Sequence, residues 1–159
     1  PGVGAFAPAM DRLNTLGFRA ALDEAVIGRK VPLLGICLGM QLLADMSNEF
    51  GEHRGLGYIP GTVREIPVTD GLRLPHMGWN DLNIERSCAL TAALSGDTSC
   101  YFVHSFALQP AHPEHVVATA EYGGRVVAVV AAGNIYGTQF HPEKSQDNGE
   151  KILSAFAGL

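Results

Sequence analysis

Residues 31–46, VPLLGICLGMQLLADM, carry the clearest indication of the fold class. Residues 31–37 form a short and almost continuous apolar run, which is the pattern of a buried parallel strand. Apolar side chains recur at helical spacing over residues 38–50, so we expect a helix directly after the strand. Residues 9–28 have the same periodicity and end at Gly28, a residue type that often caps helices. Helix, strand, tight turn and helix together predict an α/β fold with a doubly wound, mostly parallel sheet flanked by helices.

The second half of the chain is rich in strand and turn signals. Glycine occupies two predicted hairpin turns, at residues 123–124 and 133–134, so antiparallel pairs are expected there. Residues 148–159 have the apolar spacing of a final helix. No internal repeat, low-complexity tract or linker divides the sequence, and we expect a single domain over residues 1–159. The predicted strands cover residues 77–84, 100–106, 116–122, 125–131 and 135–140.

The composition excludes several classes of protein. With 159 residues, of which 47% are hydrophobic and 17% charged, the chain has the composition of a globular domain with a substantial core. The net charge is −5 and Lys and Arg are not clustered, so nucleic acid is not expected as a partner. The longest apolar stretch contains Gln41 and Asp45, which argues against a membrane span. Cys37, Cys88 and Cys100 form no CxxC pair and are odd in number, which favours a reducing compartment, the cytoplasm, over a disulfide framework.

The sequence Gly-Ile-Cys-Leu-Gly at residues 35–39 has the pattern of a nucleophile elbow, with cysteine where hydrolases carry serine. In such an elbow the flanking glycines relieve clashes around a strained nucleophile backbone. Cys37 would lie at a helix N-terminus, where the helix dipole lowers the pKa of a thiol, and the backbone N–H of Leu38 could stabilise an oxyanion. A buried, unreactive cysteine is the alternative for so short a pattern. Cys88 and Cys100 have no such context, and we expect both to be structural.

A thiolate nucleophile requires a base, and the base is usually histidine. His141 follows a predicted strand in YGTQFHPEKS, and Pro142 lets the carboxylate of Glu143 fold back toward the imidazole. Cys37, His141 and Glu143 therefore form a candidate triad of nucleophile, base and acid, against the alternative that His141 is a structural histidine. The remaining histidines are expected in solvated loops or in structural positions, and they are His53, His76, His104, His112 and His115.

Two motifs resemble those of the class I, or triad-type, glutamine amidotransferases. GICLGMQLL is similar to the nucleophile motif of the family, and FHPEKS is similar to its His-Glu motif. Four further stretches, PGVGAF, LPHMGWN, YFVHSF and GNIYGTQFHPEKSQ, resemble one branch of the family, the glutaminase subunits of imidazole glycerol phosphate synthase from histidine biosynthesis. The resemblance extends from Pro1 to the final helix. It implies a flavodoxin-like α/β fold with antiparallel strands in the C-terminal half, no cofactor and no metal.

The resemblance also implies a reaction and a partner. Cys37 would attack the carboxamide of L-glutamine and form a γ-glutamyl thioester. His141 would protonate the departing ammonia and then activate water to release glutamate, while Glu143 holds the imidazole. Ammonia would pass to a separate (β/α)8-barrel cyclase subunit, which makes imidazole glycerol phosphate. Trp79 and Lys144 match positions that face this partner, and ordinary packing or a solvated charge is the alternative for each.

The residues that hold the substrate are implied by the same resemblance. The loop PGVG at residues 1–4 would supply half of an oxyanion hole through the backbone N–H of Val3 or Gly4, opposite that of Leu38. Because glycines flank it, this peptide could rotate when the partner binds. The implied glutamine-binding residues are Gly2, Gln41, Glu49, His104, Ser105 and Phe106.

The chain departs from the family pattern at its N-terminus and at Phe106. Family members carry further residues before the glycine loop, so we expect an N-terminally incomplete domain. Such a domain would fold poorly alone, because lost strands leave apolar faces and sheet edges exposed. Phe106 stands where many members have tyrosine. The alternative functions are another class I amidotransferase, a γ-glutamyl hydrolase, and a non-catalytic scaffold subunit or inactive fragment.

Overall fold

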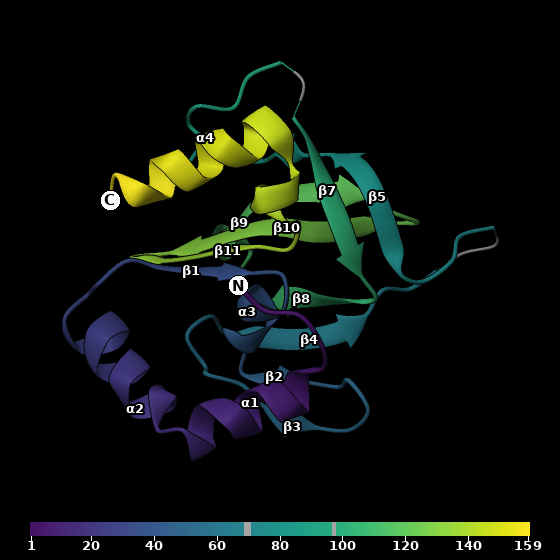
Figure 1. The fold of residues 1–159 in the computed structure, drawn as a ribbon. Helices are drawn as coiled ribbons and strands as arrows, with labels where there is room; N and C mark the ends of the chain where they lie inside the picture. The colour runs from purple at the N-terminus through teal and green to yellow at the C-terminus, as the bar shows by residue number, and fades with distance from the viewer. Residues whose placement is uncertain (69–70, 97) are drawn as a thin grey trace.

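The computed structural model describes residues 1–68, 71–96 and 98–159, and in these ranges the strands form three sheets (Figure 1). The largest sheet has, in order, β1 (Leu33–Ile36), β11 (Ile135–Thr138), β10 (Arg125–Ala132), β9 (Val116–Glu121) and β6 (Asn83–Ile84). β1 runs parallel to β11, so both strands end at the same edge of the sheet. The other pairs in this sheet are antiparallel.

Two smaller sheets complete the fold. One has the order β3 (His53–Arg54), β2 (Met46–Ser47), β4 (Gly61–Glu65) and β8 (Phe106–Pro110), and the other pairs β5 (His76–Asp81) with β7 (Ser99–His104). β2 and β4 are parallel, whereas β2–β3, β4–β8 and β5–β7 are antiparallel. The predicted α/β class is therefore confirmed. The sheets are mixed rather than mostly parallel, because among the strands of the described residues only β1–β11 and β2–β4 pair in parallel, and hairpins in the second half of the chain supply antiparallel pairs.

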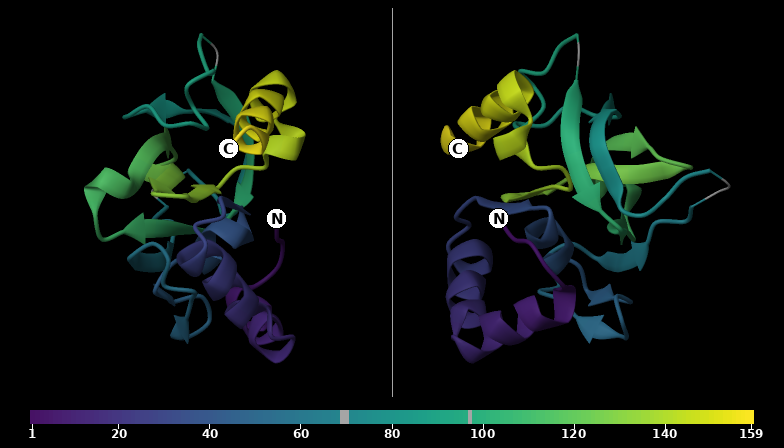
Figure 2. Two further views of the ribbon diagram at one scale, coloured as in Figure 1. Left: turned by 90° about the vertical axis from the view of Figure 1, so that its left-hand side faces the viewer. Right: turned by 45° about the vertical axis from the view of Figure 1, so that its right-hand side comes forward.

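Helices cover the sheets on opposite sides. α1 (Phe6–Thr15) and α2 (Phe18–Leu22) lie on one side, and α4 (Gln146–Ala157) lies on the other (Figures 1 and 2). None of the helices in the described part of the chain is long and apolar enough to cross a bilayer. The shorter helical elements are the π-helix η1 (Asp23–Gly28), α3 (Leu38–Leu42), and the 3-10 helices η2 (Pro113–His115) and η3 (Pro142–Lys144).

The five-stranded sheet separates two apolar clusters. Val127 and Val130 of β10 pack in one cluster with side chains of α1 and α3. Ala128 and Val129 pack in the other with side chains of β7 and α4. β10 is thus buried on both faces, which explains its continuous apolar sequence.

Both helices that the apolar spacing predicts in the first third are shorter than expected. The helix expected over residues 9–28 is interrupted at Gly17, whose φ of 73° is left-handed. The helix expected over residues 38–50 ends at Leu42. Beyond it, the N–H of Asp45 donates to the carbonyl of Gly61 at 3.1 Å, and the Asp45 carboxylate accepts from the Gly61 N–H at 3.0 Å. Sheet pairing therefore overrides helical spacing after Leu42.

The strand predictions are confirmed in place, with changes at their ends. The strand predicted over residues 77–84 is divided at Leu82, and the one over 100–106 is divided at Ser105. The strand over 135–140 ends at Thr138. β4 has no counterpart among the predicted strands, because its five residues alternate too weakly to stand out.

Gly35 is required by the close approach of β1 to α3. A Cβ added at Gly35 would lie 2.6 Å from the carbonyl oxygen of Gly39, which belongs to the backbone and cannot rotate away. We expect Gly35→Ala to lower the free energy of unfolding by about 2–3 kcal/mol, measured by chemical denaturation. Gly28→Ala is the matched control, because its nearest contact would be an ordinary 3.9 Å. Equal denaturation midpoints for Gly35→Ala and the unsubstituted protein would contradict this close approach.

Candidate active site

Cys37 lies at the sharp turn between β1 and α3, as the elbow pattern predicts. Its φ of 53° and ψ of −110° are unusual for a residue with a Cβ, and such strain occurs mainly where the surrounding structure imposes it. The N–H of Cys37 donates to the carbonyl of Thr138 at 2.8 Å, and Gly2 forms an isolated parallel bridge with Cys37. The backbone of Cys37 is therefore held from both sides.

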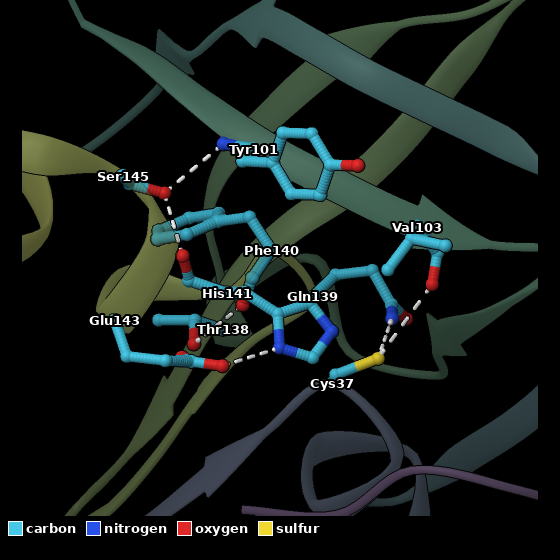
Figure 3. A network of polar contacts seen from close by, with 9 residues as sticks. All are labelled: Cys37, Tyr101, Val103, Thr138, Gln139, Phe140, His141, Glu143 and Ser145. Carbon is cyan, nitrogen blue, oxygen red and sulfur yellow. Dashed lines mark hydrogen bonds and ion pairs between the residues drawn. The ribbon is translucent and has the colours of Figure 1, made fainter.

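The thiol of Cys37 is buried, with 7% of the residue exposed, but it has polar neighbours. It lies 3.9 Å from the carbonyl oxygen of Val103, to which it can donate. The side-chain amide of Gln139 donates to the sulfur at 3.8 Å. Figure 3 shows these contacts on the side of the sulfur that faces β7.

His141 and Glu143 form the second part of the site. Nδ1 of His141 and Oε1 of Glu143 are 2.7 Å apart, and Pro142 begins η3 between them. A carboxylate accepts only, so Nδ1 carries the proton and Nε2 is left with its lone pair. Nε2 is buried and has no hydrogen-bond partner in the described residues. In Figure 3 the imidazole lies between Glu143 and Cys37, with Nε2 on the side of the thiol.

The backbone of His141 is fixed by Ser145, a residue that the motifs did not single out. The hydroxyl of Ser145 donates to the carbonyl of His141 at 2.7 Å and accepts from the N–H of Tyr101 at 3.0 Å. The N–H of His141 donates to the carbonyl of Tyr101 at 2.9 Å. β7 and the start of α4 together set the position of the imidazole.

A pocket of about 400 Å³ opens over the thiol. Of the predicted site residues, it is lined by Cys37, His141, Val3, Gly4, Leu38, Gln41, Glu49, His104, Ser105 and Phe106. Gly2 lies against the Cys37 backbone rather than in the lining, and Glu143 lies behind the imidazole. Phe50, Pro75 and Val103 also line the pocket and were not predicted.

Gln41 and Glu49 are held by contacts that the sequence did not reveal. The amide of Gln41 donates to the carbonyl of Phe106 at 2.9 Å and to Oε1 of Gln139 at 3.2 Å. Oε2 of Glu49 accepts from the N–H of Phe6 at 2.6 Å, in the first turn of α1. Glu49 therefore joins the N-terminal segment to the pocket wall.

Trp79 and Lys144 lie outside this pocket and meet at Tyr101. The rings of Trp79 and Tyr101 are 6.0 Å apart at their centroids, edge to face. Nζ of Lys144 lies 5.9 Å from the Tyr101 ring centre, on its face. Both side chains are exposed, so they form a surface beside the imidazole.

Burial dominates the electrostatics of the thiol. Desolvation raises the pKa of Cys37 above its ordinary value of 9.0, and the Glu143 carboxylate raises it further. The backbone N–H of Leu38, the Lys144 ammonium and the Gln139 amide lower this pKa by smaller amounts. The expectation that the helix N-terminus lowers the thiol pKa overall is wrong, because α3 has only five residues and the site is desolvated. A thiol with a raised pKa reacts as a nucleophile near neutral pH only when a base removes its proton.

We expect the rate of alkylation of Cys37 by iodoacetamide to be low at about pH 7 and to rise without a plateau up to about pH 9. The sign follows from the raised pKa, since the unreactive protonated form persists to higher pH. Peptide mass spectrometry reports the rate at Cys37 separately from Cys88 and Cys100, and glutathione serves as the unperturbed reference. A plateau below about pH 8 would show a lowered pKa and contradict this description.

The described part of the chain holds no cluster of three or more His, Cys, Asp or Glu side chains that could bind a metal ion. His112 and His115, which are spaced as HxxH, have rings 5.4 Å apart, but they lie at η2 without a third ligand.

These features are those of a cysteine-dependent amidotransferase, and comparison with known proteins gives the same class. The family model described as Glutamine amidotransferase class-I matches residues 1–157. The chain belongs to this family.

Within this family, the similar proteins include subunits of one enzyme, imidazole glycerol phosphate synthase. The chain is 49% identical to the imidazole glycerol phosphate synthase subunit HisH of Bdellovibrio bacteriovorus, over 100% of this chain and 79% of that protein. It is 48% identical to the subunit of the same name from Caulobacter vibrioides, over 98% of this chain and 74% of that protein. The predicted resemblance to these subunits is confirmed.

Solved structures agree at the level of the fold. A glutamine amidotransferase crystal structure superposes with a TM-score of 0.65 at 20% identity, covering 91% of this chain and 71% of that one. A second glutamine amidotransferase crystal structure, from Thermotoga maritima, superposes with a TM-score of 0.62 at 19% identity, covering 99% of this chain and 60% of that one. The predicted class I amidotransferase-like fold is confirmed.

Proposed function

We propose that this protein hydrolyses the side-chain amide of L-glutamine to glutamate and ammonia. The observation that carries this proposal is the alignment of Cys37 and His141 at the wall of one pocket with Glu143 behind the imidazole, and with the unpartnered Nε2 of His141 on the side of the thiol. Family membership supports the same reaction class. The three side chains act as orienting acid, base and nucleophile.

The first half-reaction forms a thioester. Nε2 of His141 takes the thiol proton as the sulfur of Cys37 attacks the carboxamide carbon, so a C–S bond forms and the C=O electron pair moves to oxygen. The N–H of Leu38 and an N–H from Val3 or Gly4 stabilise this oxyanion. When the tetrahedral intermediate collapses, the C–N bond breaks and His141 returns the proton to the leaving nitrogen. Ammonia departs and a γ-glutamyl thioester remains.

The second half-reaction releases glutamate. His141, neutral again, takes a proton from water as the water oxygen attacks the thioester carbon. The C–S bond then breaks, and the sulfur leaves with its electron pair and recovers the proton from His141. Glu143 stabilises the imidazolium in both half-reactions, which its 2.7 Å contact with Nδ1 supports. No reductant, oxidant or metal is required.

The ends of the substrate meet different parts of the pocket. The carboxylate of Glu49 is suited to the α-ammonium group of glutamine, because its negative charge lies on the pocket wall. Backbone N–H groups near Ser105 and Phe106 are suited to the α-carboxylate, and Gln41 fixes the Phe106 carbonyl behind them. Gly2 supports the loop that carries Val3 and Gly4.

The ammonia passes to a cyclase subunit with a (β/α)8 barrel, which makes imidazole glycerol phosphate in the cytoplasm. The identity of 48–49% with subunits of imidazole glycerol phosphate synthase supports this partner. The exposed side chains of Trp79 and Lys144, which meet at Tyr101, form part of the surface that contacts this partner. Residues 1–159 act as one amidotransferase domain in this complex, although relatives contain further residues.

Release of glutamate from glutamine tests the proposal, measured with and without the cyclase subunit and its ligand. We expect little release by this protein alone and a large increase in the complex. Absence of release under every condition would contradict the glutaminase activity and favour a scaffold. Strong release without the cyclase would contradict the subunit assignment and favour another class I amidotransferase. Faster cleavage of γ-glutamyl peptides than of glutamine would identify a γ-glutamyl hydrolase.

A further inference from the structure

Two buried histidines outside the triad, His76 and His104, form a continuous polar chain with Asn80. His76 is 2% exposed and His104 is 6% exposed. Nδ1 of His76 lies 2.9 Å from Nε2 of His104, and the amide nitrogen of Asn80 lies 3.1 Å from Nε2 of His76. At the other end, Nδ1 of His104 lies 2.8 Å from the carbonyl oxygen of Phe106. The chain therefore runs from the surface end of β5 to the pocket wall.

The acceptors in this chain fix the tautomers of both rings. The carbonyl of Phe106 can only accept, so Nδ1 of His104 carries a proton and Nε2 accepts. Nδ1 of His76 must then donate to His104, which leaves Nε2 of His76 to accept from the amide of Asn80. Every contact has one donor and one acceptor when both histidines are neutral.

Packing holds the His76 ring in the orientation that this pattern requires. The ring lies between Phe102 and Tyr122, with centroid separations of 4.6 Å and 4.1 Å and nearly parallel planes. The amide of Asn80 is oriented in turn, because it donates to the carbonyl of Glu121 at 2.9 Å. The His76 ring cannot turn to a different set of hydrogen bonds without losing its stacking on Phe102 and Tyr122.

The chain of hydrogen bonds continues from the Phe106 carbonyl to the thiol of Cys37. The Phe106 carbonyl accepts from His104 and also from the amide of Gln41. The same Gln41 nitrogen donates to Oε1 of Gln139, which leaves the Nε2 group of Gln139 directed at the sulfur of Cys37. Gln139 is fully buried, so its amide has no solvent to rotate toward.

We propose that His76 and His104 are positioning residues for the thiol: they fix the Phe106 carbonyl and, through Gln41, the Gln139 amide that donates to Cys37. This inference rests on the proposed function of Cys37 as nucleophile. It assigns to the His104 side chain a role distinct from substrate binding. An amide that donates to sulfur stabilises the thiolate as the proton leaves for His141.

Each contact in this chain of hydrogen bonds has one donor and one acceptor only while both histidine rings are neutral. Burial is the main cause that lowers the pKa of His76 and of His104 to about 4. For His104, the hydrogen bond to the Phe106 carbonyl opposes this shift, and the rings of His76 and His141 add to it. A second proton on His104 would place two N–H groups face to face at His76. The titratable groups that face the pair are the phenol of Tyr122 and the imidazole of His141. Those around the thiol are His141, Glu143, Lys144, His104 and Glu49.

Paired substitutions at His104 test the proposal, because asparagine and leucine have similar volumes and only asparagine keeps a donor near the Nδ1 position. We expect His104→Leu to raise the pKa of the Cys37 thiol by about one pH unit, the size expected for losing a hydrogen bond to a charged acceptor. The readout is the pH profile of Cys37 alkylation. His104→Asn should restore the unsubstituted profile. His112→Leu, at an exposed histidine, is the matched control and should leave it unchanged.

Gln139→Leu tests the last contact of the chain and should produce the same shift directly. In glutaminase assays of the complex, we expect both leucine variants to lower kcat with little change in KM. A change in KM alone at His104→Leu would indicate substrate binding and overturn the proposal. Unchanged alkylation profiles in both leucine variants would overturn it, and so would a shift in Gln139→Leu alone.

Nitrogen-15 NMR of the unsubstituted protein provides a test that needs no variant to fold. We expect the Nδ1–H tautomer for both His76 and His104 at neutral pH, and an Nε2–H tautomer in either ring would overturn the proposal. Alkylation and NMR require no turnover. A protein with the expected tautomers and thiol shifts that releases no glutamate would refute the proposed function and leave the hydrogen-bond chain in place.

Discussion

Cys37→Ala is expected to abolish glutamate release from glutamine, with a loss of at least about 10⁴-fold in kcat, because no other group can form the thioester. Alanine keeps the Cβ at φ 53°, so the strain at the elbow and the fold should be retained. The measurement is glutamate release by the complex with the cyclase, alongside thermal unfolding of each variant.

Cys88→Ala is the matched control for this substitution. Cys88 is half-buried, hydrogen-bonds with Thr91 and does not line the pocket, so we expect activity close to that of the unsubstituted protein. Equal rates for Cys37→Ala and the unsubstituted protein would refute the role of Cys37. Equal losses in both cysteine variants would show that the effect comes from the fold.

His141→Asn is expected to reduce kcat by about 10³-fold or more, because the base and the proton donor to ammonia are both lost. Asparagine can keep a donor to Glu143 near the Nδ1 position, so the backbone of η3 should remain in place. Glutamate release at saturating glutamine measures the loss. Near-normal kcat would show that another group acts as the base.

The chain contains its own control for this prediction. The sequence His-Pro-Glu occurs at residues 112–114 as well as at 141–143, and each copy begins a 3-10 helix. His112 and Glu114 are exposed and 3.6 Å apart, whereas the His141 side chain is 4% exposed and its Glu143 contact is 2.7 Å. His112→Asn should leave glutamate release unchanged.

This repetition marks what the sequence could predict of the site. The tripeptide alone does not separate His112 from His141. The predicted strand that ends just before His141 favoured that copy, and the structure places His141 in the same pocket lining as Cys37. Burial distinguishes the two histidines physically. His141 is buried because Ser145 and Tyr101 hold its backbone against β7. Gln139 was not predicted, although a glutamine at the end of an apolar strand two residues before His141 was a signal for a buried contact.

The fold was predictable where a pattern is local. The strand at residues 31–37 and the elbow at Cys37 depend on neighbouring residues and were found. The helix expected over residues 38–50 was too long, because Asp45 pairs with Gly61, sixteen residues away in sequence. The thiol pKa was misjudged for a similar reason: desolvation comes from elements that the motif does not contain.

The γ-glutamyl thioester on Cys37 can be detected by mass spectrometry of the complex, quenched with acid during turnover of glutamine. We predict a γ-glutamyl adduct on the peptide that contains Cys37, and its absence from Cys37→Ala. In Glu143→Gln, where the imidazole loses its orienting carboxylate, both formation of the adduct and release of glutamate should be slower, because Glu143 stabilises the imidazolium in both half-reactions. Glutamate release at an undiminished rate with no adduct on Cys37, or with an adduct on another residue, would contradict this account.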